Sequence, residues 1–161
     1  MKQITDLPII PPRQSNAHKG NFGKVLVLAG SKCMSGAAAL IGTAALNCGA
    51  GLVRVATSAS AQPAVASLNP CYTTDALPED QLGQINSDAF AKVAELARQH
   101  DIIAAGPGLG TAKTTRDLII SLIKLPDIKI VMDADGLNCL SQVRNWHNYN
   151  KADMIITPHP G

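Results

Sequence analysis

Residues 24–58 have the sequence KVLVLAGSKCMSGAAALIGTAALNCGAGLVRVATS. The run at 24–31 is apolar, is rich in branched side chains and ends in Gly-Ser, which predicts a buried strand that meets a turn. The Ala-rich run at 35–48 predicts a helix with Ser35 as its N-cap. A second apolar run at 52–58 follows after about the length that a parallel crossover needs. The stretch therefore predicts a β-α-β unit.

The alternation of strands and helices continues along the rest of the chain. From apolar runs and helical spacing, strands are predicted at 101–106 and 128–134, and helices at 87–99 and 112–125. The segment MIITPHPG at 154–161 is predicted as a last strand that runs into a Pro-Gly loop. The stretch at 62–85 has little periodicity and is expected to be irregular. Five strands alternating with helices predict an α/β fold, in which helices flank a mostly parallel sheet on both faces.

The chain stops at Gly161, in a turn directly after the last predicted strand. No helix follows that could cover this strand, although a parallel sheet is normally covered on both faces. The sequence is therefore expected to be the first part of a longer domain.

Composition narrows the classes of protein. The 161 residues fit one domain or part of one, and the formal charge of +2 comes from 14 basic and 12 acidic residues that form no basic stripe. A nucleic-acid partner is therefore not expected. No apolar run approaches the roughly 20 residues of a membrane span, so no membrane partner is expected. Four widely spaced cysteines suit a reducing, cytoplasmic location.

Four loops follow predicted strands and form the candidate site. They are GSKCMSGAA (30–38), GPGLG (106–110), DADGLN (133–138) and TPHPG (157–161). In an open parallel sheet, ligands collect beyond the carboxyl ends of the strands, which is where these loops are expected to lie.

Each loop also has a purely structural explanation. The glycines of 30–38 match neither the dinucleotide-binding spacing nor the P-loop spacing, and could serve only to pack helix on sheet. GPGLG could be a tight turn, or a backbone surface that a ligand approaches closely. For DADGLN there are two interpretations, metal binding and a purely structural role, and we prefer the structural role. In that interpretation Asp135 caps a short helix and Asp133 accepts backbone hydrogen bonds.

His159 lies between two prolines at a predicted strand end. The stiff loop would hold its ring in few conformers, as a binding residue requires, although a lone histidine is more often structural. The other histidines have no spacing that would join His159 in a metal site, so no metal ligands are predicted.

An ordered series of segments extends from residue 18 to the end of the chain: HKG at 18–20, then AGS, SGAAAL, AALNCGAGLVRVAT, GPGLG, DADGLN and TPHPG. In this order the segments resemble the NAD(P)H-hydrate dehydratase family. The resemblance implies a ribokinase-like fold, here a truncated three-layer αβα arrangement. Residues 1–17 would be an N-terminal extension. Residues 18–161 would be the N-terminal part of a dehydratase domain, without its C-terminal nucleotide-binding part.

The resemblance also implies an activity, the repair of NADH or NADPH whose nicotinamide ring has been hydrated. ADP in bacterial and archaeal members, or ATP in eukaryotic ones, would phosphorylate the ring hydroxyl, and loss of phosphate would restore the dihydronicotinamide. Mg²⁺ would screen the polyphosphate during the transfer. A homotetramer and a functional link to an NAD(P)H-hydrate epimerase are further expectations from the family.

The family's substrate-binding residues correspond to Ala37, Gly108 and His159. Five further residues would support the same pocket: Gly36, Gly106, Gly110, Asp133 and Asn138. Lys19 and Gly20 would lie beside the nucleotide or the substrate. The family's catalytic aspartate belongs to a GTGD motif that would lie beyond Gly161, so no general base is nominated. The 161 residues alone are expected to be inactive.

Two other functions stay open at this point. One is a small-molecule kinase of the same superfamily, of the thiazole or pyridoxal type. The other is a non-catalytic, truncated module that binds nucleotides. A reading frame that continues through GTGD would favour an enzyme, and a true stop would favour the binding module.

Overall fold

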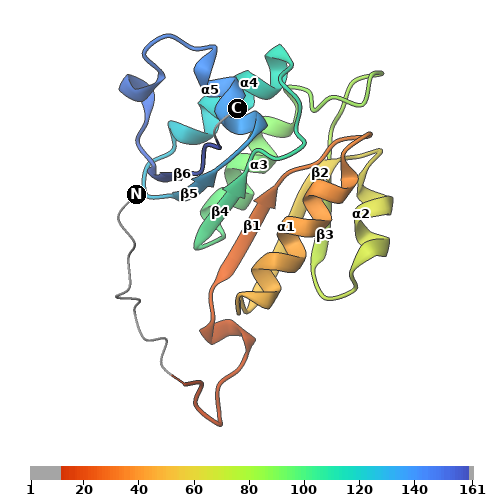
Figure 1. The fold of residues 1–161 in the computed structure, drawn as a ribbon, viewed down its shortest axis with the longest axis vertical. Helices are drawn as coiled ribbons and strands as arrows, with labels where there is room; N and C mark the ends of the chain where they lie inside the picture. Colours follow the sequence, from red (N-terminus) through yellow and green to blue (C-terminus); the bar gives the residue numbers. More distant parts are fainter. Residues whose placement is uncertain (1–11, 160–161) are drawn as a thin grey trace.

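The computed structural model describes residues 12–159 and contains one six-stranded sheet with the order β3-β2-β1-β4-β5-β6 (Figure 1). Every neighbouring pair of strands is parallel. The strands are β1 (Lys24–Leu28), β2 (Leu52–Ser58), β3 (Thr73–Leu77), β4 (Ile102–Ala105), β5 (Lys129–Met132) and β6 (Asp153–Ile156). The helices are α1 (Ser35–Asn47), α2 (Gln62–Leu68), α3 (Ala89–Arg98), α4 (Lys113–Ile123) and α5 (Asp135–Ser141), with 3-10 helices η1 (Lys19–Asn21) and η2 (Trp146–Tyr149). The predicted α/β class is confirmed.

The order of the strands changes direction between β1 and β4. From β1 the chain adds β2 and then β3 on one side. It then returns to place β4 on the other side of β1, and continues outward through β5 and β6. Such a reversal is the place where an open α/β sheet leaves a crevice at its carboxyl edge.

Side chains of the strands alternate between two cores. Leu26 and Leu28 of β1 belong to the core beneath α3, α4 and α5, whereas Val27 belongs to the core beneath α1 and α2. The second core extends only as far as Ala104 of β4, and Ile155 of β6 is 63% exposed. Helices therefore flank both faces, as predicted. None of the helices between residues 12 and 159 is long and apolar enough to span a membrane.

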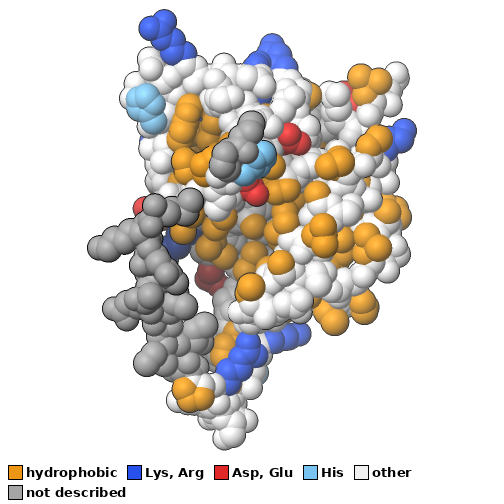
Figure 2. Space-filling view, viewed as in Figure 1, with side chains coloured by type: hydrophobic (Ala, Val, Ile, Leu, Met, Phe, Trp, Pro, Cys, Tyr) orange, Lys and Arg blue, Asp and Glu red, His pale blue; other side chains and the backbone are white. Residues whose placement is uncertain are grey.

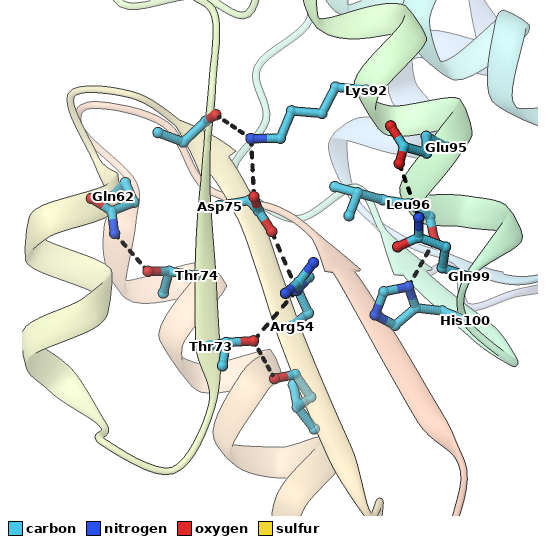
Figure 3. A network of polar contacts seen from close by, with 12 residues as sticks. Arg54, Gln62, Thr73, Thr74, Asp75, Lys92, Glu95, Leu96, Gln99 and His100 are labelled. Atoms are coloured by element: carbon cyan, nitrogen blue, oxygen red, sulfur yellow. Dashed lines mark hydrogen bonds and ion pairs between the residues drawn. The ribbon is translucent and has the colours of Figure 1, made fainter.

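The prediction that 62–85 is irregular is wrong, because this segment contains α2 and β3. A proline in the first turn of α2, Pro63, suits a helix start, where its missing N–H is not needed. The edge strand β3 has the polar sequence TTDAL, which gives no alternation of apolar residues. Asp75 of β3 is instead paired with Arg54 of β2 at 3.3 Å and with Lys92 of α3 at 2.9 Å (Figure 3). The sheet therefore has one strand more than predicted.

The predicted N-cap of α1 is also wrong. Ser35 is the first residue of the helix, so Met34 occupies the cap position and makes no side-chain cap hydrogen bond. The Met34 carbonyl oxygen instead accepts a hydrogen bond of 3.1 Å from the Ala37 N–H. The start of α1 is thus formed by backbone groups, next to the loop that follows β1.

Candidate active site

The loops that follow β1 and β4 meet where the strand order reverses. These neighbouring strands continue into α1 and α4, which pack on opposite faces of the sheet. The Gly30 N–H donates a hydrogen bond of 2.9 Å to the Pro107 carbonyl oxygen, which joins the two loops. The structure therefore brings the loop 30–38 and the loop 106–110 together at the edge where ligands bind in this class of sheet.

Ala37 and Gly108, two of the predicted substrate-binding residues, lie against each other. Gly108 is buried and has a φ of +71°. A Cβ at Gly108 would lie 3.0 Å from the Ala37 Cβ and 2.8 Å from the Met34 Cβ, closer than side chains normally approach. The contact needs a glycine, and it fixes the loop after β4 against the start of α1.

Gly36 and Gly110 flank this contact and are open. A Cβ built at either position would meet no atom within 4 Å in the described chain. Gly36 is exposed and Gly110 is partly exposed. A ligand can therefore approach the backbone on both sides of the contact between Ala37 and Gly108.

Gly106 joins the loops after β4 and β5. It has a φ of +129°, and a Cβ there would overlap the Asp133 carbonyl oxygen. The Asp133 Oδ1 accepts a hydrogen bond of 2.8 Å from the Ala134 N–H, as predicted for a loop anchor. Ala134 has a φ of +47°, a conformation that is strained for a residue with a Cβ. Such strain is concentrated at functional sites, so it marks the loop after β5 as part of this region.

Asp135 does not cap α5 as predicted, because it lies inside the helix and Ala134 holds the cap position. Its Oδ2 accepts a hydrogen bond of 2.9 Å from the Gly110 N–H, and its Oδ1 accepts one of 3.2 Å from the Asn138 amide. Asp135 thereby supports the GPGLG loop, a role that the sequence analysis missed because the partner is distant in sequence. The available signal was that Asp135 and Gly110 both follow predicted strands, whose loops share one edge of a parallel sheet.

Cys139 lies beneath the same loop. Its Sγ is 3.7 Å from the Gly110 carbonyl oxygen and the side chain is buried. Burial, together with the nearby Asp135 carboxylate, raises the pKa of the Cys139 thiol to about 11, while Arg116 acts in the opposite direction. Cys139 is therefore a neutral packing residue and not a nucleophile.

Two buried hydroxyls lie at the carboxyl end of β2. Thr57 and Ser58 are fully buried, and neither hydroxyl oxygen has a hydrogen-bond partner among residues 12–159. The Thr57 hydroxyl lies next to Gly30, at 3.1 Å from the position of a Cβ there. Buried polar groups normally have hydrogen-bond partners. These two hydroxyls therefore leave hydrogen-bonding groups available beside the loop that follows β1.

The remaining predicted residues lie elsewhere. His159 is exposed and follows β6, two strands away from β4 in the sheet. Lys19 and Gly20 belong to η1, before the amino end of β1, where the Gly20 N–H donates to the His18 Nδ1 at 3.1 Å. They therefore lie at the edge of the sheet opposite to Ala37 and Gly108, and the described chain does not bring these two groups together.

The described residues do not provide a ready magnesium site. No group of three or more His, Cys, Asp or Glu side chains suited to a metal occurs between residues 12 and 159. The two carboxylates nearest the loops, Asp133 and Asp135, already accept hydrogen bonds. The site thus offers glycine backbone, small side chains and hydroxyls, which suit binding and orientation of a ligand more than proton transfer.

The fold is that of the ribokinase-like α/β proteins. The solved structure of a ribokinase-like superfamily protein from Enterococcus faecalis superposes with a TM-score of 0.72 over 93% of this chain and 50% of that one, at 24% identity. This similarity establishes the fold.

The particular family follows from the sequence comparison. The profile described as NAD(P)H-hydrate dehydratase matches residues 25–161, and the chain belongs to that family. A bifunctional NAD(P)H-hydrate repair enzyme of Moorella thermoacetica is 36% identical over 94% of this chain. The solved ADP/ATP-dependent NAD(P)H-hydrate dehydratase of Bacillus subtilis, co-crystallized with ATP/Mg²⁺, has a TM-score of 0.71 and 28% identity over 93% of this chain.

The chain corresponds to only part of each relative. It spans 29% of the Moorella enzyme and 49% of the Bacillus structure. The family and the fold are therefore established for this chain, while the activity of a whole protein that contains it is a matter for proposal.

Proposed function

We propose that this chain is the substrate-facing part of an enzyme that restores hydrated NADH or NADPH by dehydration driven by ADP or ATP. The contact between Ala37 and Gly108 carries the proposal. It joins two segments that are far apart in sequence at the point where the sheet reverses, and leaves open backbone at Gly36 and Gly110 beside it. The names of the Moorella and Bacillus proteins support the same reaction.

Ala37 and Gly108 would contact the hydrated nucleotide, and His159 would join them from the loop after β6. Five residues would shape and support the pocket: Gly36, Gly106, Gly110, Asp133 and Asn138. Lys19 and Gly20 are proposed as nucleotide contacts that act from the opposite edge of the sheet. Residues 1–17 and 18–161 are proposed as an extension and as the first part of the dehydratase domain.

The terminal phosphoryl group of the nucleotide would move to the oxygen of the ring hydroxyl. The carbon-oxygen bond would then break and phosphate would leave, and loss of a proton from the adjacent ring carbon would form the dihydronicotinamide double bond. ADP would yield AMP, and ATP would yield ADP. Mg²⁺ would enter with the polyphosphate, since phosphate oxygens and waters are its usual ligands and the described carboxylates already accept hydrogen bonds.

The outer surfaces of α1 and α2 support the proposal of a homo-oligomer. Leu40 of α1 is 73% exposed and Leu68 of α2 is 59% exposed, and Figure 2 shows hydrophobic side chains gathered over these helices. Exposed apolar surface of this kind often marks an interface. A tetramer is the proposed state.

The bifunctional name of the Moorella relative supports a link with a second repair activity, for which we propose the epimerase. We propose a cytoplasmic location.

The test is recovery of the dihydronicotinamide absorbance after hydrated NADH is mixed with Mg²⁺ and either ADP or ATP. The 161-residue chain and the longest translated product of its gene are assayed side by side. Recovery with one nucleotide identifies the donor. Absence of recovery in the longest product refutes the dehydratase function, and accumulation of a stable phosphorylated small molecule would instead indicate a kinase.

A variant links the activity to the site. Gly36→Ala adds one methyl group at an exposed position with no neighbour, so it leaves packing intact and interferes only with a ligand. It is expected to raise KM for the hydrate on the order of 10-fold, as loss of a close backbone contact does. The matched control is Ser67→Ala, also a small change on an exposed helix surface, which should leave KM within a factor of about two.

A further inference from the structure

A second pocket lies at the opposite edge of the sheet, at the amino ends of β1, β2 and β3. Its volume is about 410 Å³, and the end of α3 closes one side of it. It is separate from the loops described above, which follow the carboxyl ends of the strands. The family's predicted substrate residues Ala37, Gly108 and His159 are not among its walls.

The pocket is lined by cationic and hydrogen-bonding side chains. Lys24, Arg54 and His100 line it together with Thr73 and Gln99, and none of its described lining residues is acidic. A concave surface with this charge pattern favours an anion over a neutral or cationic ligand.

Arg54 is held in place by the strand beside it. Its Nε is 3.3 Å from the Asp75 Oδ2 and 3.5 Å from the Thr73 Oγ1 (Figure 3). An arginine anchored through Nε presents its terminal nitrogens as a fork that matches two oxygens of a phosphate.

His100 is oriented in the same way. Its Nδ1 is 2.7 Å from the Leu96 carbonyl oxygen, an acceptor, so Nδ1 carries the hydrogen. In Figure 3 the other ring nitrogen faces the side on which Arg54 lies. The Lys24 Nζ has no hydrogen-bond or ion-pair partner in the described chain, and only the backbone N–H of Lys24 is bound, to the Asp101 Oδ2 at 2.7 Å.

The neighbouring carboxylates Asp75, Asp101 and Glu95 lie outside the lining of the pocket, and Glu95 accepts a hydrogen bond of 3.0 Å from the Gln99 amide. Asp75 is shared between Arg54 and Lys92, at 3.3 Å and 2.9 Å, so one negative charge serves two cations. Asp101 adjoins the pocket without lining it. The apolar wall comes from Leu52 and Val53.

We propose that this pocket binds a small phosphate ester, with the phosphate held by Arg54, Lys24 and His100 and an apolar or ring portion against Leu52 and Val53. The volume exceeds that of a phosphate ion alone, which leaves room for such a portion. Binding in this pocket does not depend on the dehydratase activity. The phosphate-ester proposal and the proposed dehydratase function can therefore be refuted independently.

The test uses phenyl phosphate as the probe and phenol as its uncharged counterpart, titrated into the full ¹⁵N-labelled chain and followed by NMR. Phenyl phosphate should shift the amide signals of Arg54, Thr73 and His100 and leave those of 106–110 in place. Phenol should bind at least about 10-fold more weakly, the difference expected for charge-assisted hydrogen bonds. Absence of phenyl phosphate binding, or shifts confined to 106–110, would overturn the proposal.

Two variants separate the pocket from the ion-pair network. Arg54→Gln removes the fork and should weaken phenyl phosphate binding about 10-fold to 100-fold. Lys92→Met removes the other cation paired with Asp75, and Lys92 lies outside the pocket. The affinity of this variant for phenyl phosphate should therefore stay within a factor of about two of the parent. Equal affinities in the two variants would refute the site. If Arg54→Gln lowers the melting temperature more than Lys92→Met does, Lys24→Gln is compared with Lys92→Met instead. Lys24→Gln should weaken phenyl phosphate binding at least about 3-fold.

Discussion

Replacing Gly108 by alanine tests the contact on which the candidate active site rests. Gly108 has a φ of +71°, a region in which an L residue costs roughly 1–2 kcal/mol, partly offset by a stiffer unfolded chain. The added Cβ would also lie 2.8 Å from the Met34 Cβ and 3.0 Å from the Ala37 Cβ. Forcing an extra methyl group into a closed contact costs roughly 1–3 kcal/mol. The two effects together should lower the free energy of unfolding by about 2–4 kcal/mol.

Gly110→Ala is the matched control, because Gly110 has a φ of +78° but no neighbour within 4 Å of a Cβ. Gly110→Ala should lower the free energy of unfolding only through the backbone conformation, by about 1 kcal/mol. Urea unfolding and thermal melting of both variants give the comparison. For a domain of this size about 1 kcal/mol corresponds to roughly 2–4 °C, so Gly108→Ala should melt on the order of 10 °C below the parent and Gly110→Ala a few degrees below it. Equal losses would refute the close packing of the loop after β4 against α1.

Three further results are expected. Gly36→Ala should raise the free energy of unfolding by about 0.5–1 kcal/mol, since it places alanine for glycine in a helix without a clash, and a loss in urea unfolding would contradict the open surface there. Cys139, whose thiol pKa is raised to about 11 by burial and by the Asp135 carboxylate, should resist a thiol reagent at pH 8 while the three exposed cysteines react. Fast reaction of all four would contradict its burial. Tyr72→Phe removes a buried hydrogen bond of 2.7 Å to the Val65 carbonyl oxygen and should lower the free energy of unfolding by about 1–1.5 kcal/mol. The same change at Tyr149, which is 46% exposed, should have an effect within about 0.5 kcal/mol in the same urea titration.

Segments with a strong apolar pattern were predicted closely. The strand predicted at 52–58 is β2 with the same limits, and the helix predicted at 35–48 is α1 to within one residue. In both, local composition and burial agree, since β2 lies between β1 and β3 and α1 packs on the sheet. The order of motifs was also sufficient to identify the family, which the profile match over 25–161 confirms.

Segments held by distant partners were predicted poorly. β3 was missed because its polar residues are stabilised by Arg54 and Lys92, which lie on other elements. The contact of Asp135 with the Gly110 N–H was missed for the same reason, since the prediction considered only its own helix. In both cases the interaction joins residues that local spacing cannot relate.

The sequence by itself determined the α/β class, the position of the loops at the carboxyl ends of the strands, and the family. These follow from the period of apolar residues and from glycines at loop positions, which are local properties of the chain. Only the tertiary structure decided that β4 lies beside β1, that Ala37 touches Gly108, and that Lys24, Arg54 and His100 line one pocket. The physical reason is that strand order depends on how helices cover the whole sheet. Residues far apart in the chain therefore meet only after that packing is complete.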